Sequence, residues 1–217
     1  MPANPGQQKK AAKQKKKREL ARRRATPPPA IGTSRASLLR QAALLPHGPS
    51  FVSADFTMTR MDPPRLVSVV VTRKVPGGML LPALALVDRT CLGVKNAFVA
   101  ELVSEYEFGG FVLEVGRAHE GGLVPCELAV AQSIVWNAVD YAASLGFDPH
   151  PDFPEVLFGP RPAPLLDTPL AHPSKPFWVR GPDDDVEEIL ATLDESVGEG
   201  NYDVAMITGM GGVGETG

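Results

Sequence analysis

The sequence contains few cysteines and no long apolar run. Cys91 and Cys126 are the only two cysteines in 217 residues, and they form no CxxC pair, which argues against a zinc site or a disulfide-stabilised fold. No apolar run approaches the ~20 residues of a membrane-spanning helix, and no apolar segment follows the basic start as in a secretory signal. We therefore expect a cytoplasmic protein with reduced, buried thiols and no membrane contact.

The net charge of −3 is distributed unevenly along the chain. Residues 1–24 hold ten basic residues and one acidic residue, Glu19, and so carry +9 (10 − 1), which leaves −12 (−3 − 9) for the remainder. We predict that residues 1–30 form a disordered arm, because they offer no apolar surface to offset the entropy of folding. The ten basic residues are Lys9, Lys10, Lys13, Lys15, Lys16, Lys17, Arg18, Arg22, Arg23 and Arg24.

A basic arm on an acidic body indicates binding to a polyanion through counterion release. We predict a non-enzymatic protein that binds RNA or the ribosome through this arm. The arm has no aromatic residue to stack on bases, so the binding should tolerate many sequences. A solubilising tail, or an arm that contacts its own acidic body, are the other interpretations.

Beyond the arm, the sequence predicts one α+β domain over residues 31–208 and a flexible Gly-rich tail at 209–217. We expect a mostly antiparallel sheet of about four to six strands, covered by three to four helices. Residues 66–88 predict a hairpin of buried strands, because two apolar runs flank the turn at Pro76, Gly77 and Gly78.

The clearest helix is predicted at residues 125–145, where apolar residues recur every three and four positions. Pro125 suits the first turn of this helix, and Gly146 can end it in a left-handed conformation. Shorter patterns predict helices at 37–45, 96–107 and 182–197, an edge strand or loop at 51–60, and strands at 111–115, 156–159, 176–179 and 202–208.

Two groups of polar residues are candidates for chemistry. Asp88 and Cys91 follow the second hairpin strand, and His150 and Asp152 belong to a segment stiffened by two prolines. A strand-end Asp and a rigid His-x-Asp are able to hold a divalent metal. The alternative function is therefore a metal-dependent hydrolase or nuclease, whereas a Cys91 nucleophile would need a His partner in space.

Each candidate also has a structural interpretation. Asp88 can cap a turn, Cys91 can fill a small space in the core, and His150 and Asp152 can belong to an ordered connector. One His and one or two carboxylates are too few for a metal signature, so we predict neither a metal nor a cofactor. His119 and Glu120, in a polar loop, could join a site, but we expect them to face solvent. Catalytic activity and oligomeric state stay open.

The sequence shows two resemblances to known proteins. Residues 209–216 resemble the phosphate-binding loop of nucleotide hydrolases, but Glu215 stands where that loop needs lysine, so we expect no nucleotide there. The motifs LVDRTCLGVKNAF (residues 86–98) and YAASLGFDPHPDF (residues 141–153) together resemble a family of bacterial cytoplasmic proteins of unknown function, over about residues 65–208. That resemblance implies a single domain and no particular activity, cofactor or site residue.

Overall fold

The structure is a computed structural model that describes residues 34–56, 66–161 and 172–206. The ten basic residues of the arm and the Gly-rich tail lie outside this part. The chain divides into two compact units, Met1–Leu38 and Leu39–Gly217. Helix α2 (Arg35–Gln41) begins in the first unit, and a 3-10 turn, η1 (Ala42–Leu44), follows it in the second. The predicted helix at 37–45 is thereby confirmed.

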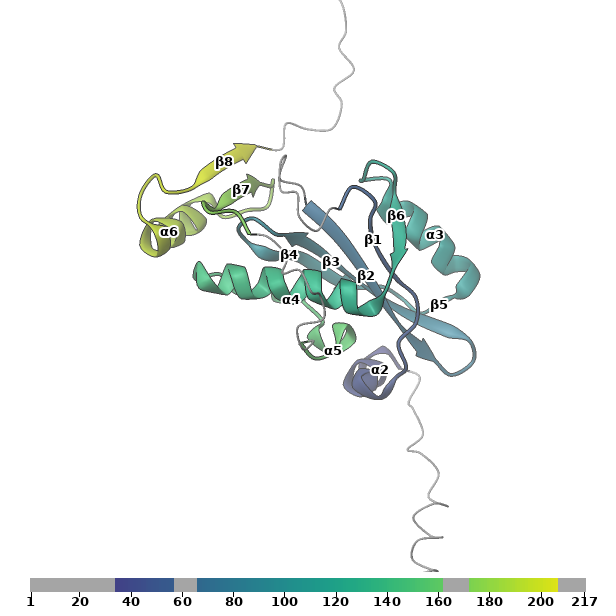
Figure 1. Ribbon diagram of the computed structural model, residues 1–217. Helices are drawn as coiled ribbons and strands as arrows, with labels where there is room; N and C mark the ends of the chain where they lie inside the picture. Colours follow the sequence, from purple (N-terminus) through teal and green to yellow (C-terminus); the bar gives the residue numbers. More distant parts are fainter. Residues whose placement is uncertain (1–33, 57–65, 162–171, 207–217) are drawn as a thin grey trace, which may run out of the picture. The chain divides into compact units, whose positions relative to one another are not determined.

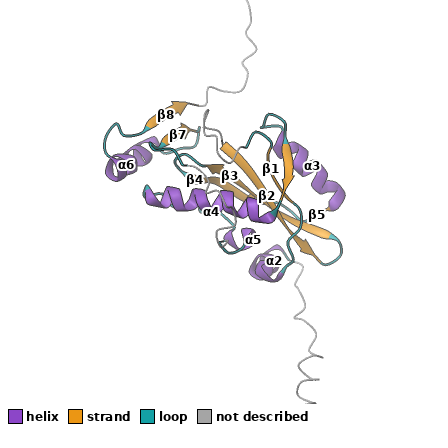
Figure 2. Cartoon of the chain, viewed as in Figure 1, coloured by secondary structure: helices purple, strands orange, loops and turns teal. Residues whose placement is uncertain are grey.

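The second unit is built on an antiparallel sheet, which confirms the predicted α+β class (Figure 1, Figure 2). Six strands form this sheet within the described residues, in the order β4-β3-β2-β1-β6, with β5 beside β3. They are β1 (Ser50–Ser53), β2 (Leu66–Val75), β3 (Met79–Asp88), β4 (Gly93–Val99), β5 (Val103–Ser104) and β6 (Leu123–Cys126).

Strands β2 and β3 form the predicted hairpin. Their register runs without a break from Leu66 opposite Asp88 to Val75 opposite Met79. Gly77 and Gly78 make the turn with φ of 89° and 74°, a backbone conformation that glycine adopts at little cost. Residues 67–73 are buried without alternation, so both faces of the hairpin are covered.

Helices α4 (Leu128–Ser144) and α3 (Glu105–Gly116) pack on the sheet. Val70 packs with Phe108 of α3, and since neighbouring residues of a strand point to opposite faces, Val69 and Val71 face away from α3, on the side that α4 covers (Figure 1). The buried side of α4 is rich in alanine, which brings this helix close to the sheet.

A smaller parallel sheet follows α4. Strands β7 (Phe177–Arg180) and β8 (Asp203–Met206) are joined by helix α6 (Val186–Val197), which confirms the predictions for the last three elements. Their buried side packs on the β3–β4 turn and on the end of α4, in one cluster of Cys91, Leu92, Leu145, Trp178, Ile189 and Leu193. None of the described helices is long and apolar enough to cross a membrane.

The prediction between residues 96 and 115 is wrong. Residues 93–99 form β4, which pairs with β3, and α3 covers the region predicted as a strand at 111–115. The start of α3 is set by a capping box, in which Ser104 and Glu107 satisfy each other's backbone N–H groups. Gly109 and Gly110 lie within this helix and do not break it.

Three smaller predictions also need correction. Residues 155–158 form one helical turn, α5 (Glu155–Phe158), where a strand was predicted. Strand β1 lies between β2 and β6, so it is internal and not an edge strand. Pro125 belongs to β6, and α4 begins three residues later, at Leu128. Gly146 has φ of 87° after α4, as predicted.

Candidate functional site

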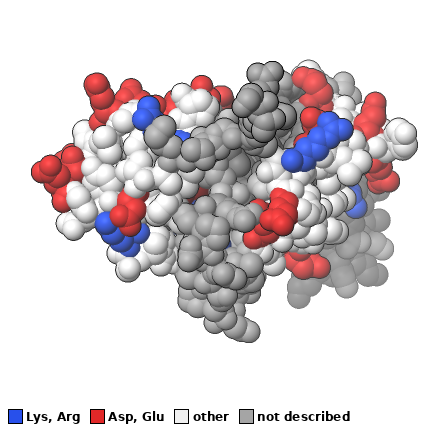
Figure 3. All heavy atoms as spheres, turned by 90° about the horizontal axis from the view of Figure 1, so that it is seen from above, with Lys and Arg blue, Asp and Glu red and all other residues white. Residues whose placement is uncertain are grey.

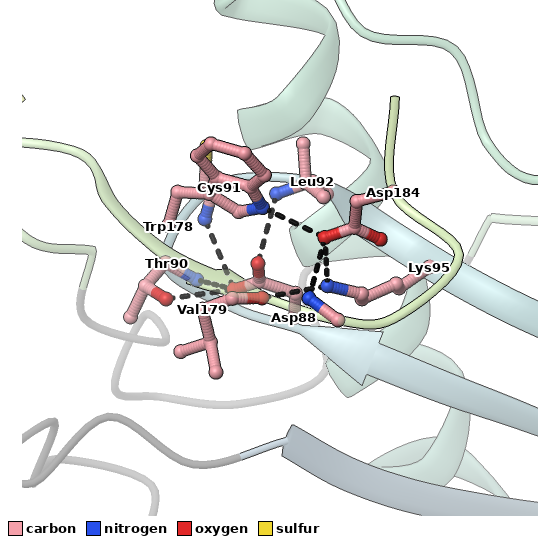
Figure 4. A network of polar contacts seen from close by, with 9 residues as sticks. Asp88, Thr90, Cys91, Leu92, Lys95, Trp178, Val179 and Asp184 are labelled. Carbon is pink, nitrogen blue, oxygen red and sulfur yellow. Dashed lines mark hydrogen bonds and ion pairs between the residues drawn. The ribbon is translucent and has the colours of Figure 1, made fainter. Parts of the chain in front are cut away.

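Asp88 is buried at the end of β3, where it caps the turn into β4 (Figure 4). Its Oδ1 accepts hydrogen bonds from the N–H and Oγ1–H of Thr90 at 2.8 and 2.7 Å and from the N–H of Cys91 at 3.1 Å. Its Oδ2 accepts from the N–H of Leu92 at 3.3 Å. Burial raises the pKa of Asp88, and the turn's hydrogen bonds and the charge of Lys95 oppose that shift. The carboxylate of Asp88 therefore accepts hydrogen bonds from the turn that it caps, as its structural interpretation predicted.

Lys95 lies on β4 beside this turn and bridges to the smaller sheet (Figure 4). Its Nζ donates to the Val179 carbonyl and to Asp184 Oδ2, both at 2.6 Å. The N–H groups of Gly181 and Trp178 donate to the same oxygen at 2.8 and 2.9 Å. Burial disfavours the ionised form of Asp184, but these N–H donors and Lys95 hold its pKa below its ordinary value. The pair fastens the smaller sheet to β4.

Cys91 is enclosed in the apolar cluster between the two sheets. Burial raises the pKa of its thiol far above the ordinary value, and the nearby carboxylate of Asp88 adds to that shift. A thiol that stays protonated is a poor nucleophile. Cys91 therefore fills space in the core, as its structural interpretation predicted.

His150 and Asp152 lie in an ordered connector between α4 and α5. The N–H of His150 donates to the Val94 carbonyl at 2.9 Å, and its Nδ1 accepts from the N–H of Asp152 at 3.1 Å. Phe153 is buried against Trp136 and so fixes the segment to α4. No three His, Cys, Asp or Glu side chains in the described ranges could hold a metal ion, so Asp88, His150 and Asp152 do not converge as the alternative function requires.

Arg73 is a buried cation that the sequence reasoning missed. Its guanidinium donates to three backbone carbonyls, those of Leu45, Val156 and Leu157, at 2.9, 2.9 and 3.0 Å. It lies in the wall of a pocket of about 700 Å³ that Trp136 also lines. The N–H groups of Arg73 are hydrogen-bonded to backbone carbonyls from two chain segments. Arg73 therefore serves chiefly to hold η1 and α5 against the sheet.

Ser68, His119 and Asp55 form a second polar cluster, which we call the Ser68 cluster. Ser68 Oγ lies 2.8 Å from His119 Nε2, and His119 Nδ1 lies 3.6 Å from Asp55 Oδ1. The side chains of His119 and Asp55 are 7% and 14% exposed, so the prediction that His119 faces solvent is wrong. Burial lowers the pKa of His119, although the carboxylate of Asp55 opposes that shift. Because the pKa is lowered, the imidazole is neutral near pH 7.

The Ser68 cluster adjoins an apolar pocket of about 360 Å³ between the sheet and α3. The pocket is lined by Ser68, Leu84, Leu86, Asn96, Phe98, Phe111, Glu114, Val115 and Ala118. Its residues come from β2, β3, β4, α3 and the turn after α3. No local sequence pattern relates these segments. The sequence therefore gave one indication of this cluster, which was the presence of His119 in a polar loop.

The clusters differ in their capacity for chemistry. Asp88 and Asp184 are engaged in several hydrogen bonds that hold the fold together, whereas Ser68 and His119 combine a hydroxyl, a neutral base and a pocket. The resemblance over residues 65–208 stays a prediction. Comparisons of the chain with protein-family models, with curated proteins and with solved structures found no match.

Proposed function

We propose that this protein associates with RNA, either free or in the ribosome, through the ten basic residues of its N-terminal arm. The observation that carries this proposal is the separation of charge. Residues 1–24 carry +9, whereas the described residues include 10 basic and 21 acidic ones, a net charge of −11. A polyanion is attracted to the arm and repelled by the body, so the arm is the part suited to hold it.

The surface of the body supports this assignment. Among the residues that Figure 3 does not draw in grey, the basic side chains on this face form small separate groups among acidic ones. Several of the body's cations are paired with carboxylates: Lys95 with Asp184, Arg117 with Glu114, Arg161 with Asp140 and Lys175 with Asp203. Phosphate groups would have to displace these carboxylates, which favours the arm as the binding element.

Fluorescence anisotropy with a labelled single-stranded RNA of mixed sequence, titrated over a range of salt concentrations, tests the proposal. Each phosphate contact contributes about 0.7 to the slope of log Kobs against log salt for a single strand. Replacing the first five lysines of the arm by glutamine should therefore reduce the magnitude of the slope by up to about 3.5. Deleting residues 1–24 should abolish binding, and co-sedimentation with purified ribosomes then separates ribosome binding from binding to free RNA.

The matched control removes two exposed cations from the body, with Lys74→Gln and Arg117→Gln in one variant. This variant should keep both the affinity and the slope of the unmodified protein, because the body makes no phosphate contact. Equal binding by the unmodified protein and by the variant without residues 1–24 would show that the proposal is wrong. No observation favours the metal-dependent hydrolase, since its three residues form no metal-holding group.

A further inference from the structure

Ser68 lies on the face of the sheet that α3 covers only in part. Phe51 and Val70 are opposite each other on β1 and β2 and pack against Phe108 of α3. Ser68 is two residues from Val70 along β2 and therefore points to the same face. It is 4% exposed as a residue, yet it lines the apolar pocket beside α3. The hydroxyl thus lies at the wall of a space that can admit an apolar group.

His119 is positioned to take the proton of this hydroxyl. Its Nε2 is 2.8 Å from Ser68 Oγ, within normal hydrogen-bond distance. Asp55 lies 3.6 Å from Nδ1 on the other side of the ring and favours the tautomer with hydrogen on Nδ1. In that tautomer Nε2 accepts the Ser68 O–H, which is the arrangement of a nucleophile, a base and an orienting carboxylate.

A second hydroxyl points to the same face of the sheet. The pairing of β1 with β2 ends at Val52 opposite Val69, and Ser53, the next residue of β1, shares the face of Phe51 and therefore of Val70 and Ser68. Ser53 is completely buried, and its Oγ has no hydrogen-bond partner in the described part of the chain. A buried hydroxyl without a partner calls for an explanation. A donor next to the nucleophile is what the negative oxygen of a tetrahedral intermediate needs.

We propose that the Ser68 cluster is a catalytic site that hydrolyses carboxylic esters with an apolar acyl group. Ser68 is the nucleophile, His119 is the general base and acid, and Asp55 is a positioning residue. Ser53 donates to the acyl oxygen. The pocket, lined by Leu84, Leu86 and Phe111, takes the acyl chain, and the carboxylate of Glu114 in the same lining disfavours anionic acyl groups.

The reaction has two steps. In the first, Ser68 Oγ bonds to the acyl carbon while its proton passes to His119 Nε2; the ester C–O bond then breaks, and the alcohol leaves with that proton. In the second, water attacks the acyl carbon, gives a proton to His119, and the bond to Ser68 Oγ breaks. His119 returns the proton to Ser68 Oγ. One ester and one water become one acid and one alcohol, with no redox change.

Two measurements on the full chain test the site. The first is hydrolysis of p-nitrophenyl acetate and p-nitrophenyl butyrate; kcat/KM should be at least about tenfold higher for butyrate, because the pocket is apolar. The second is labelling with a fluorophosphonate, in which Ser68 Oγ displaces fluoride; peptide mass spectrometry should then find the adduct on Ser68. Ser68→Ala should remove the adduct and reduce kcat about 10³-fold or more.

Further variants separate catalysis from folding. Ser53→Ala should reduce kcat about 100-fold at unchanged KM, as for loss of one oxyanion donor. His119→Gln should remove the dependence of kcat/KM on a base that titrates below pH 6.5. Ser50→Ala is the matched control, since Ser50 is buried on the same strand as Ser53 but points to the opposite face. This variant should hydrolyse both p-nitrophenyl esters at the rates of the unmodified protein.

Three results would overturn the proposal. They are no fluorophosphonate adduct on Ser68 in the folded protein, ester hydrolysis no faster than in buffer, and equal rates for Ser68→Ala and the unmodified protein. Circular dichroism of each variant shows whether it is folded, so loss of structure is distinguished from loss of catalysis. These results are independent of the arm, because RNA binding by residues 1–24 does not involve the Ser68 cluster.

Discussion

The buried carboxylates of Asp88 and Asp184 differ from the Ser68 cluster in how their side-chain atoms are hydrogen-bonded. Asp88 accepts four hydrogen bonds from the turn that it caps, and Asp184 Oδ2 accepts three that hold the segment after β7 in place. In contrast, the Ser68 hydroxyl contacts the imidazole of His119, a neutral base, at the wall of a pocket. Carboxylates that hold a turn or a segment act in the architecture of the fold, whereas a hydroxyl–imidazole pair beside a pocket is a candidate for chemistry.

The Lys95–Asp184 pair should contribute far more stability than a similar pair at the surface. Its side chains are 10% and 9% exposed, and Asp184→Asn removes the ion-pair partner of Lys95 while the charge of Lys95 stays buried. We expect a loss of about 3 kcal/mol in the free energy of unfolding. Urea unfolding followed by tryptophan fluorescence measures it, with Trp178 in direct contact with Asp184.

Lys175 and Asp203 provide the control for this prediction. Their Nζ–Oδ1 distance is also 2.6 Å, but their side chains are 42% and 55% exposed. Solvent screens such a pair, so Asp203→Asn should cost less than about 1 kcal/mol. Equal losses for Asp184→Asn and Asp203→Asn would contradict the view that the Lys95–Asp184 pair fastens the smaller sheet.

At the scale of elements, the close approach of α4 to the sheet organises the fold. The helix presents Ala138 and Ala142 to the start of β4, where Gly93 has φ of 68°. A Cβ on Gly93 would lie 2.7 Å from Ala142 Cβ and 3.0 Å from the Ala138 carbonyl oxygen. Neither a larger residue on the helix nor a side chain at the turn fits this contact.

Gly93→Ala should therefore destabilise the protein by about 3 kcal/mol, the sum of a left-handed backbone and a steric clash. Gly77→Ala is the matched control, because Gly77 has φ of 89° in open space and carries only the backbone cost of about 1–2 kcal/mol. Thermal unfolding by circular dichroism compares them. Adding Ala142→Gly to Gly93→Ala should restore part of the lost stability, whereas adding it to Gly77→Ala should not. If it restores nothing in Gly93→Ala, the clash with Ala142 is refuted.

At the scale of the whole molecule, positive charge is concentrated in residues 1–24 and negative charge in the remainder of the chain. The buried side chains of the sheet, α4 and α6 lie within residues 39–217, whereas the ten basic residues lie within residues 1–24. A body with a net charge near −12 repels itself, and an attached cationic segment lowers the total to −3.

Removal of residues 1–24 should accordingly preserve cooperative unfolding and make the stability of the protein more dependent on salt concentration. Raising the salt concentration from about 10 to 300 mM screens the repulsion among acidic residues, so the truncated protein should gain more stability than the full chain. Differential scanning calorimetry at both concentrations measures this difference. Loss of a cooperative transition on truncation would mean that the first 24 residues are part of the folded core.

The sequence by itself determined the features that depend on neighbouring residues. The β2–β3 hairpin, the helix at 128–144 and the charge separation all follow from local periodicity or composition. Only the tertiary structure decided that residues 93–99 form a strand, because pairing with β3 overrides local preference there. It also decided which polar residues meet. Lys95 and Asp184 are 89 positions apart, and Ser68 and His119 are 51 apart, so only folding brings them into contact.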